Sequence, residues 1–144
     1  MREVVREHVT VGHADTVAWN HLAKLKQWPT WAAHIKSMDP TPPGDLTAST
    51  SVVLHMRAGP RTTMTVTEYD PPHRWVWEGR SFMTVTRFEH RFERMGDNQT
   101  RIWFLAWVSG PVARPVGWMF GRMMRRYLSL ALPRLKAEIE SNPA

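Results

Sequence analysis

The feature that most constrains the fold is a change of hydrophobic period near residue 110. Before this point, apolar and polar residues alternate in short runs separated by turn residues, as they do in antiparallel strands. From about Val112 to Glu140, apolar residues instead recur at helical spacing, over an arc too broad for an isolated helix. A chain of 144 residues has the size of one domain. We therefore expect residues 1–144 to form a single α+β domain, with a sheet packed against a long C-terminal helix.

About seven strands are expected. The first is the alternating run at residues 4–11, and the second lies near Ile35, before a Pro-rich segment at 38–45 that is expected to be a loop. Five more strands follow, linked by short turns as in a meander. They are expected at residues 50–58, 61–69, 73–80, 82–94 and 100–109.

Two short helices are expected between the first two strands. The first covers residues 16–25, and the second has Pro29 in its first turn, where proline is tolerated. Trp28 and Trp31 flank this proline. Tryptophan side chains are large and favour buried positions, so both rings are expected to pack against neighbouring elements.

The composition disfavours several kinds of site. The chain has no cysteine, which excludes disulfides and thiolate metal sites and fits a cytoplasmic protein. No apolar run is long enough for a signal peptide or a membrane span. The seven histidines show no HxH or HExxH spacing, and neither a GxSxG motif nor a Gly-rich phosphate loop is present. We therefore expect no metal, no cofactor and no nucleophilic triad.

The formal charge of +6 raises the question of an anionic partner. Residues 110–144 carry six basic and two acidic side chains, and the segment GWMFGRMMRRY mixes aromatic residues with arginines, as interfacial helices do. However, no nucleic-acid-binding motif accompanies the charge. The apolar side of the helix is also needed by the sheet. We expect neither specific nucleic-acid binding nor stable membrane insertion.

Four segments, in this order, resemble a known superfamily. They are TVAWNHLAKLKQWPTWAAHI, VTEYDPPHRWVWEG, EHRFE followed by TRIWF, and LPRLKAEIE. Together they resemble the START and birch-pollen-allergen (SRPBCC) superfamily, and within it the polyketide cyclase/dehydrase-like branch. The resemblance implies a helix-grip fold, in which a curved antiparallel sheet grips the long C-terminal helix around an apolar cavity. It also implies that the two short helices close one end of that cavity.

Alternation along the strands selects the side chains expected to face this cavity. His90 and Phe88 share one parity, while the charged residues between 85 and 93 share the other. Trp28 is expected only to plug the closed end. The lining is expected to include Trp31, Val53, His55, Met64, Val66, Trp75, Trp77, Phe88, His90, Phe104, Phe120, Met123 and Tyr127.

Two functions stay open. The first is the binding of a hydrophobic small molecule that is aromatic, polyketide or lipid-like. The alternative is a polyketide cyclase or dehydratase, with His90 and Tyr127 as acid/base groups. A buried histidine is also compatible with a purely structural role, bonded to a neighbouring group.

The strand at 100–109 is apolar on both faces. Only one face of a single sheet can meet the helix, so the other is expected to leave an exposed aromatic patch that contains Trp103 and Trp107. Such patches often mark contacts between proteins. A homodimer formed through this face is therefore a hypothesis.

Overall fold

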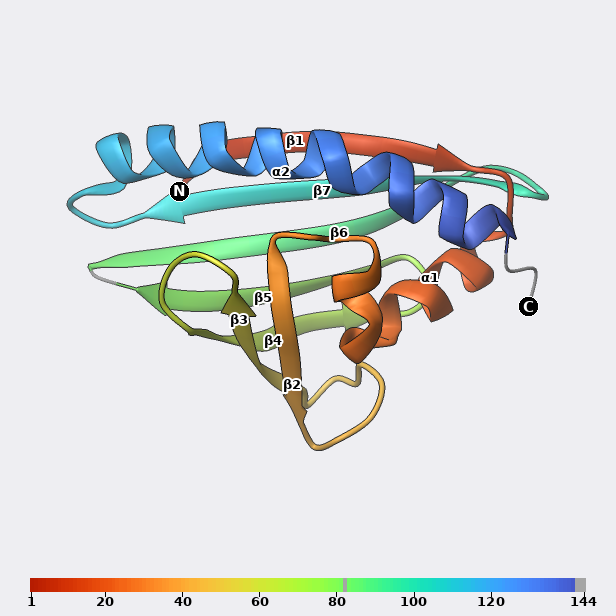
Figure 1. Cartoon of the computed structure of the whole chain (residues 1–144), viewed down its shortest axis with the longest axis horizontal. Helices are drawn as coiled ribbons and strands as arrows, with labels where there is room; N and C mark the ends of the chain where they lie inside the picture. The colour runs from red at the N-terminus through yellow and green to blue at the C-terminus, as the bar shows by residue number, and fades with distance from the viewer. Residues whose placement is uncertain (82, 142–144) are drawn as a thin grey trace.

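The computed structural model shows a seven-stranded antiparallel sheet that curves beside one long helix (Figure 1). The structure describes residues 1–81 and 83–141. Along the sheet the strand order is β1-β7-β6-β5-β4-β3-β2, so the first strand pairs with the last, and β1 and β2 form the two edges. The predicted helix-grip fold is confirmed.

All seven expected strands are present. Their bounds are β1 (Arg2–Val11), β2 (Ile35–Thr41), β3 (Ser51–Met56), β4 (Thr62–Asp70), β5 (Arg74–Ser81), β6 (Thr84–Gly96) and β7 (Gln99–Ser109). The expected strand at 82–94 is β6, and residue 82 lies outside the described residues. The expected loop at 38–45 is wrong at its start because β2 continues through Pro40. An edge strand tolerates proline because one of its sides needs no N–H donors.

Two short helices connect β1 to β2. The first, α1 (Asp15–Ala23), buries Trp19 and Leu22, and the second, η1 (Leu25–Thr30), is a 3-10 helix that contains Trp28 and Pro29. The indole Nε1 of Trp28 donates a hydrogen bond to the Leu22 carbonyl at 2.7 Å. This bond ties η1 to the end of α1.

The long helix α2 (Ala113–Ser141) lies along β1 (Figure 1). It approaches closely because Gly117 and Gly121 face that strand: a Cβ atom on Gly121 would come within 2.6 Å of the Val4 carbonyl oxygen. Farther along, Leu128 and Leu135 are buried. The helical period predicts one apolar face, but the observed buried face is rotated from it, and Leu130 on the predicted face is 65% exposed. The predicted face contains Val116, Phe120, Met123, Tyr127, Leu130 and Ala131. The two glycines have no apolar side chain to mark them as the contact face.

The expected exposed aromatic patch on the outer face of the sheet is wrong. Trp103 and Trp107 are only half-buried, but arginine side chains cover their rings. The guanidinium carbons of Arg6 and Arg101 lie 5.8 and 6.0 Å from the Trp103 ring centroid. That of Arg87 lies 5.7 Å from the Trp107 ring. These contacts reduce the apolar area that the face offers to water.

Candidate functional site

An apolar cavity of about 320 Å³ lies between the inner face of the sheet and α2. Its walls come from all seven strands, η1 and the N-terminal part of α2, so segments far apart in the sequence contribute to it. Among the described residues that line it there is no Lys, Arg, Asp or Glu. Its composition suits a neutral apolar molecule, because burying an unpaired charge there costs several kcal/mol.

Tryptophan side chains close the inner end of the cavity. The rings of Trp28 and Trp31 lie 4.9 Å apart between centroids, and Trp28 is 5.8 Å from Trp77. Trp31 is 1% exposed and also meets the ring of Phe104 at 6.2 Å. Both Trp28 and Trp31 line the cavity, so the expectation that Trp28 is only a plug is wrong. The turn at Pro29 positions both rings.

His90 lies in this aromatic wall. It is 4% exposed, and its ring centroid is 4.5 Å from Trp75, 5.1 Å from Phe104 and 5.5 Å from both Trp28 and Trp77. Neither ring nitrogen has a hydrogen-bond partner among the described residues.

Burial lowers the pKa of His90 to about 3, because the charged imidazolium loses its hydration among these rings. The imidazole is therefore neutral near pH 7. In that form it offers one N–H donor and one nitrogen acceptor, and its basicity is low.

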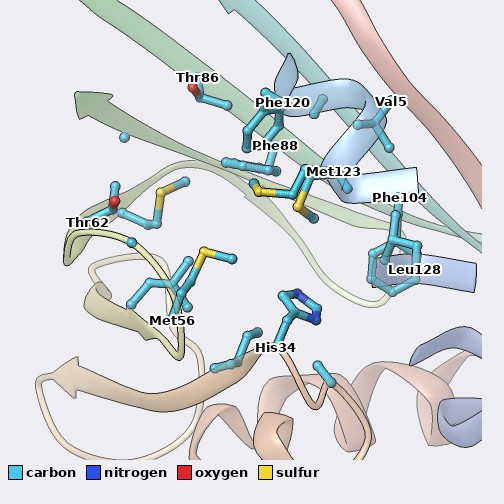
Figure 2. Close-up of a pocket in the computed structure, with 18 of the residues that line it drawn as sticks. Val5, His34, Met56, Thr62, Thr86, Phe88, Phe104, Phe120, Met123 and Leu128 are labelled. Carbon is cyan, nitrogen blue, oxygen red and sulfur yellow. The ribbon is translucent and has the colours of Figure 1, made fainter. Parts of the chain in front are cut away.

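The other end of the cavity is more exposed to solvent. Figure 2 shows His34 and Met56 across from Phe120 and Met123 of α2. Met123 lines the cavity and is 37% exposed, so it lies at the boundary between cavity and solvent. The His34 ring stacks on Tyr127 with centroids 4.4 Å apart and an angle of 4°. Burial lowers the pKa of His34 to about 4.

Eight of the thirteen residues expected in the lining are found there. They are Trp31, Met64, Trp77, Phe88, His90, Phe104, Phe120 and Met123.

Val53 and His55 were expected in the lining and lie instead on the opposite face of β3. Leu54 and Met56 line the cavity in their place. The register explains the difference: Val52 pairs with Met64, whose side chain faces the cavity, so the even-numbered residues of β3 point inward. Alternation was an available signal, because Val52, Leu54 and Met56 are all apolar, whereas Ser51 and His55 on the other parity are polar.

Three further expected residues lie near the cavity without lining it. Val66 and Trp75 are in the hydrophobic core beside it. Tyr127 lies behind His34, on which it stacks.

Several lining residues were not predicted from the sequence. His34 follows η1 and lines the cavity. Val5 and Leu128 enter through the contact between β1 and α2. Thr62 and Thr86 add hydroxyl groups, and for Thr86 the alternation shared with His90 was an available signal.

Within residues 1–81 and 83–141, no three His, Asp or Glu side chains come together as a set of metal ligands. None of the helices in this part of the chain has the length and apolar character needed to cross a bilayer.

A protein-family model described as "polyketide cyclase / dehydrase and lipid transport" matches residues 2–140. A search of curated protein sequences finds no match. Solved structures are similar in fold at low sequence identity, and three of them show the range.

A hypothetical protein from Helicobacter pylori has a TM-score of 0.78 at 16% identity, over 94% of this chain and 86% of that one. An aromatase/cyclase from Streptomyces sp. R1128 has a TM-score of 0.69 at 17% identity, over 94% and 92%. A START superfamily protein from Mycobacterium smegmatis has a TM-score of 0.69 at 11% identity, over 96% and 98%. At these identities the likeness concerns the fold alone.

Proposed function

Because this chain belongs to the polyketide cyclase/dehydrase and lipid transport family, we propose that it binds a hydrophobic small molecule in the cavity between the sheet and α2. The single observation that carries the proposal is the uncharged, largely apolar lining of a cavity of about 320 Å³. This volume lies within the range of small-molecule sites, roughly 300–1,000 Å³. Aromatic, polyketide and lipid-like molecules all suit such walls.

The direct test fills the cavity and measures binding of one probe, 2-methylnaphthalene, by equilibrium dialysis. Thr86→Phe adds a ring to the lining at a half-buried position of β6 and should largely abolish binding. Thr63→Phe adds the same ring at an exposed position of β4 and should leave binding unchanged. Equal binding by the wild type and Thr86→Phe would put the probe outside the cavity and count against the proposal. Native mass spectrometry, followed by organic extraction, would identify any molecule that copurifies.

An enzyme of the cyclase or dehydratase type is the second candidate. It is supported by the fold shared with an aromatase/cyclase and by the imidazole of His90 in the cavity lining. The test is turnover of a poly-β-keto thioester, followed by chromatography, in the wild type, His90→Ala and Tyr127→Phe. Loss of turnover in folded His90→Ala would support a catalytic role for this residue. Turnover that survives the substitution rejects that role.

The location and the oligomeric state also remain predictions. A cysteine-free chain fits the reducing cytoplasm. A homodimer through Trp103 and Trp107 now requires that the arginines over these rings form part of the interface. Size-exclusion chromatography with light scattering, well above micromolar concentration, tests it: a monomeric mass rejects the dimer.

A further inference from the structure

The inner end of the cavity contains buried polar atoms that the protein itself leaves without partners. Among the described residues, neither nitrogen of His90 nor the indole Nε1 of Trp31 makes a hydrogen bond. Both side chains line the cavity, and their residues are 4% and 1% exposed. A buried polar group without a partner costs about 1–3 kcal/mol. The neighbouring Trp28 differs, since its Nε1 donates to the Leu22 carbonyl.

The chemistry of these atoms defines a complementary ligand group. A neutral imidazole is a donor at one nitrogen and an acceptor at the other, and the indole N–H of Trp31 is a donor only. A hydroxyl both donates and accepts, so it satisfies either nitrogen of His90 and can also accept from Trp31. A carbonyl oxygen accepts only. A carboxylate or an ammonium group would enter a cavity whose described lining contains no opposite charge.

The walls limit the rest of the molecule. Aromatic rings from η1, three strands and α2 line the cavity, and they favour flat, ring-containing ligands through stacked and edge-to-face contacts. The aromatic lining residues are Trp28, Trp31, Trp77, Phe88, Phe104 and Phe120.

We infer that the cavity recognises a neutral, ring-containing molecule with a hydroxyl group at its buried end, which hydrogen-bonds to His90 and Trp31. This rests on the proposed function and specifies its ligand class. His90 and Trp31 are then binding residues of the site, and the rest of the aromatic wall provides shape and apolar contact.

The test compares two probes of similar shape, 2-naphthol and 2-methylnaphthalene, at pH 7 by equilibrium dialysis. Each affinity is corrected for the water–cyclohexane partition of the probe, because cyclohexane, unlike octanol, forms no hydrogen bond with the hydroxyl. The wild type should then prefer 2-naphthol by at least about fivefold, the effect of one net hydrogen bond. His90→Leu and Trp31→Phe should each reduce this preference while still binding 2-methylnaphthalene.

Phe88→Leu is the matched control, because Phe88 lines the same cavity and has no polar side-chain atom. It should weaken both probes alike and leave the preference intact. A wild type that binds both probes with equal corrected affinity would overturn the inference while the proposed function stands. A preference that survives both His90→Leu and Trp31→Phe would also overturn it. If neither probe binds the wild type, the proposed function itself fails.

Discussion

Glu89 and His90 are consecutive residues of β6, and the pleat directs their side chains to opposite faces of the sheet. Both are almost completely buried, at 3% and 4% exposure. On the outer face, the Glu89 carboxylate accepts hydrogen bonds from Arg91 at 2.6 and 2.8 Å and lies 3.5 Å from Arg74 Nε. On the inner face, His90 packs against four aromatic rings and makes no hydrogen bond among the described residues.

The difference between these neighbours separates two uses of a buried polar group. Glu89 is neutralised by its own chain, and its pairing holds adjacent strands of the outer face together. His90 contributes no such pairing, so its presence weakens the free protein. A buried polar group that lowers the stability of the free protein is expected at a binding site, where function rather than stability determines which residue is present.

The largest expected effect is on acid stability. In the unfolded chain His90 binds a proton near pH 6.5, whereas in the folded protein burial lowers its pKa to about 3. Between these values the unfolded state binds the extra proton, so folding stability is retained above pH 6.5 and lost as the pH falls toward 3. At pH 4 the loss attributable to His90 is roughly 3 kcal/mol.

Urea unfolding of the wild type and His90→Leu at pH 7 and pH 4 measures this effect. The wild type should lose more stability on acidification than His90→Leu does, by that amount. At pH 7 the variant should be about as stable as the wild type, or more stable, because it removes an unpartnered polar group. The same acid sensitivity in both proteins would mean that folding does not perturb the titration of His90, and the contrast with Glu89 would disappear.

The next largest effect distinguishes two tryptophans that close the inner end of the cavity. Trp28→Phe and Trp31→Phe delete the same atoms from two neighbouring buried rings, but only Trp28 loses a hydrogen bond, the 2.7 Å bond to the Leu22 carbonyl. Trp28→Phe should therefore lower the free energy of unfolding by about 1 to 2 kcal/mol more than Trp31→Phe. Urea unfolding at pH 7 measures both. Equal losses of unfolding free energy would show that the hydrogen bond of the Trp28 indole does not contribute to stability.

Much of this contrast was predictable from local pattern. In β6 the charged residues from Arg87 to Glu93 share one parity, so alternation assigns Glu89 and His90 to opposite faces without any knowledge of neighbouring strands. The change of period near residue 110 likewise predicts α2, and short turns predict the meander. These features follow from the order of residues along one element.

The remaining features depend on contacts between elements. The rotation of α2 depends on the fit of Gly121 against the Val4 backbone, and a glycine has no apolar side chain that pattern analysis can detect. His34 reaches the cavity through the path of the chain after η1. Neither of these is encoded in the period of a single segment.

The smallest expected effect concerns the outer face. Glu89→Gln keeps the size of the side chain and removes its charge, which weakens the charge-assisted bonds from Arg91. Because Arg91 and Arg74 are partly exposed and regain water, the loss of stability should be about 1 kcal/mol rather than that of a fully buried ion pair. Urea unfolding at pH 7 measures it. Glu78→Gln, on the same face of β5 and with no ion pair among the described residues, is the matched control and should change stability by less than about 0.5 kcal/mol.

Glu89→Gln should also leave the preference for 2-naphthol over 2-methylnaphthalene unchanged when the corrected affinities of the two probes are measured. The carboxylate lies on the face of the sheet that is turned away from the cavity and lines no part of it. Residue 89 should thus affect stability without affecting binding, while residue 90 affects binding at a cost in stability. If Glu89→Gln instead reduced the preference as His90→Leu does, the two faces of the sheet would be coupled through β6. The assignment of stability to the outer face and of ligand recognition to the inner face would then be wrong.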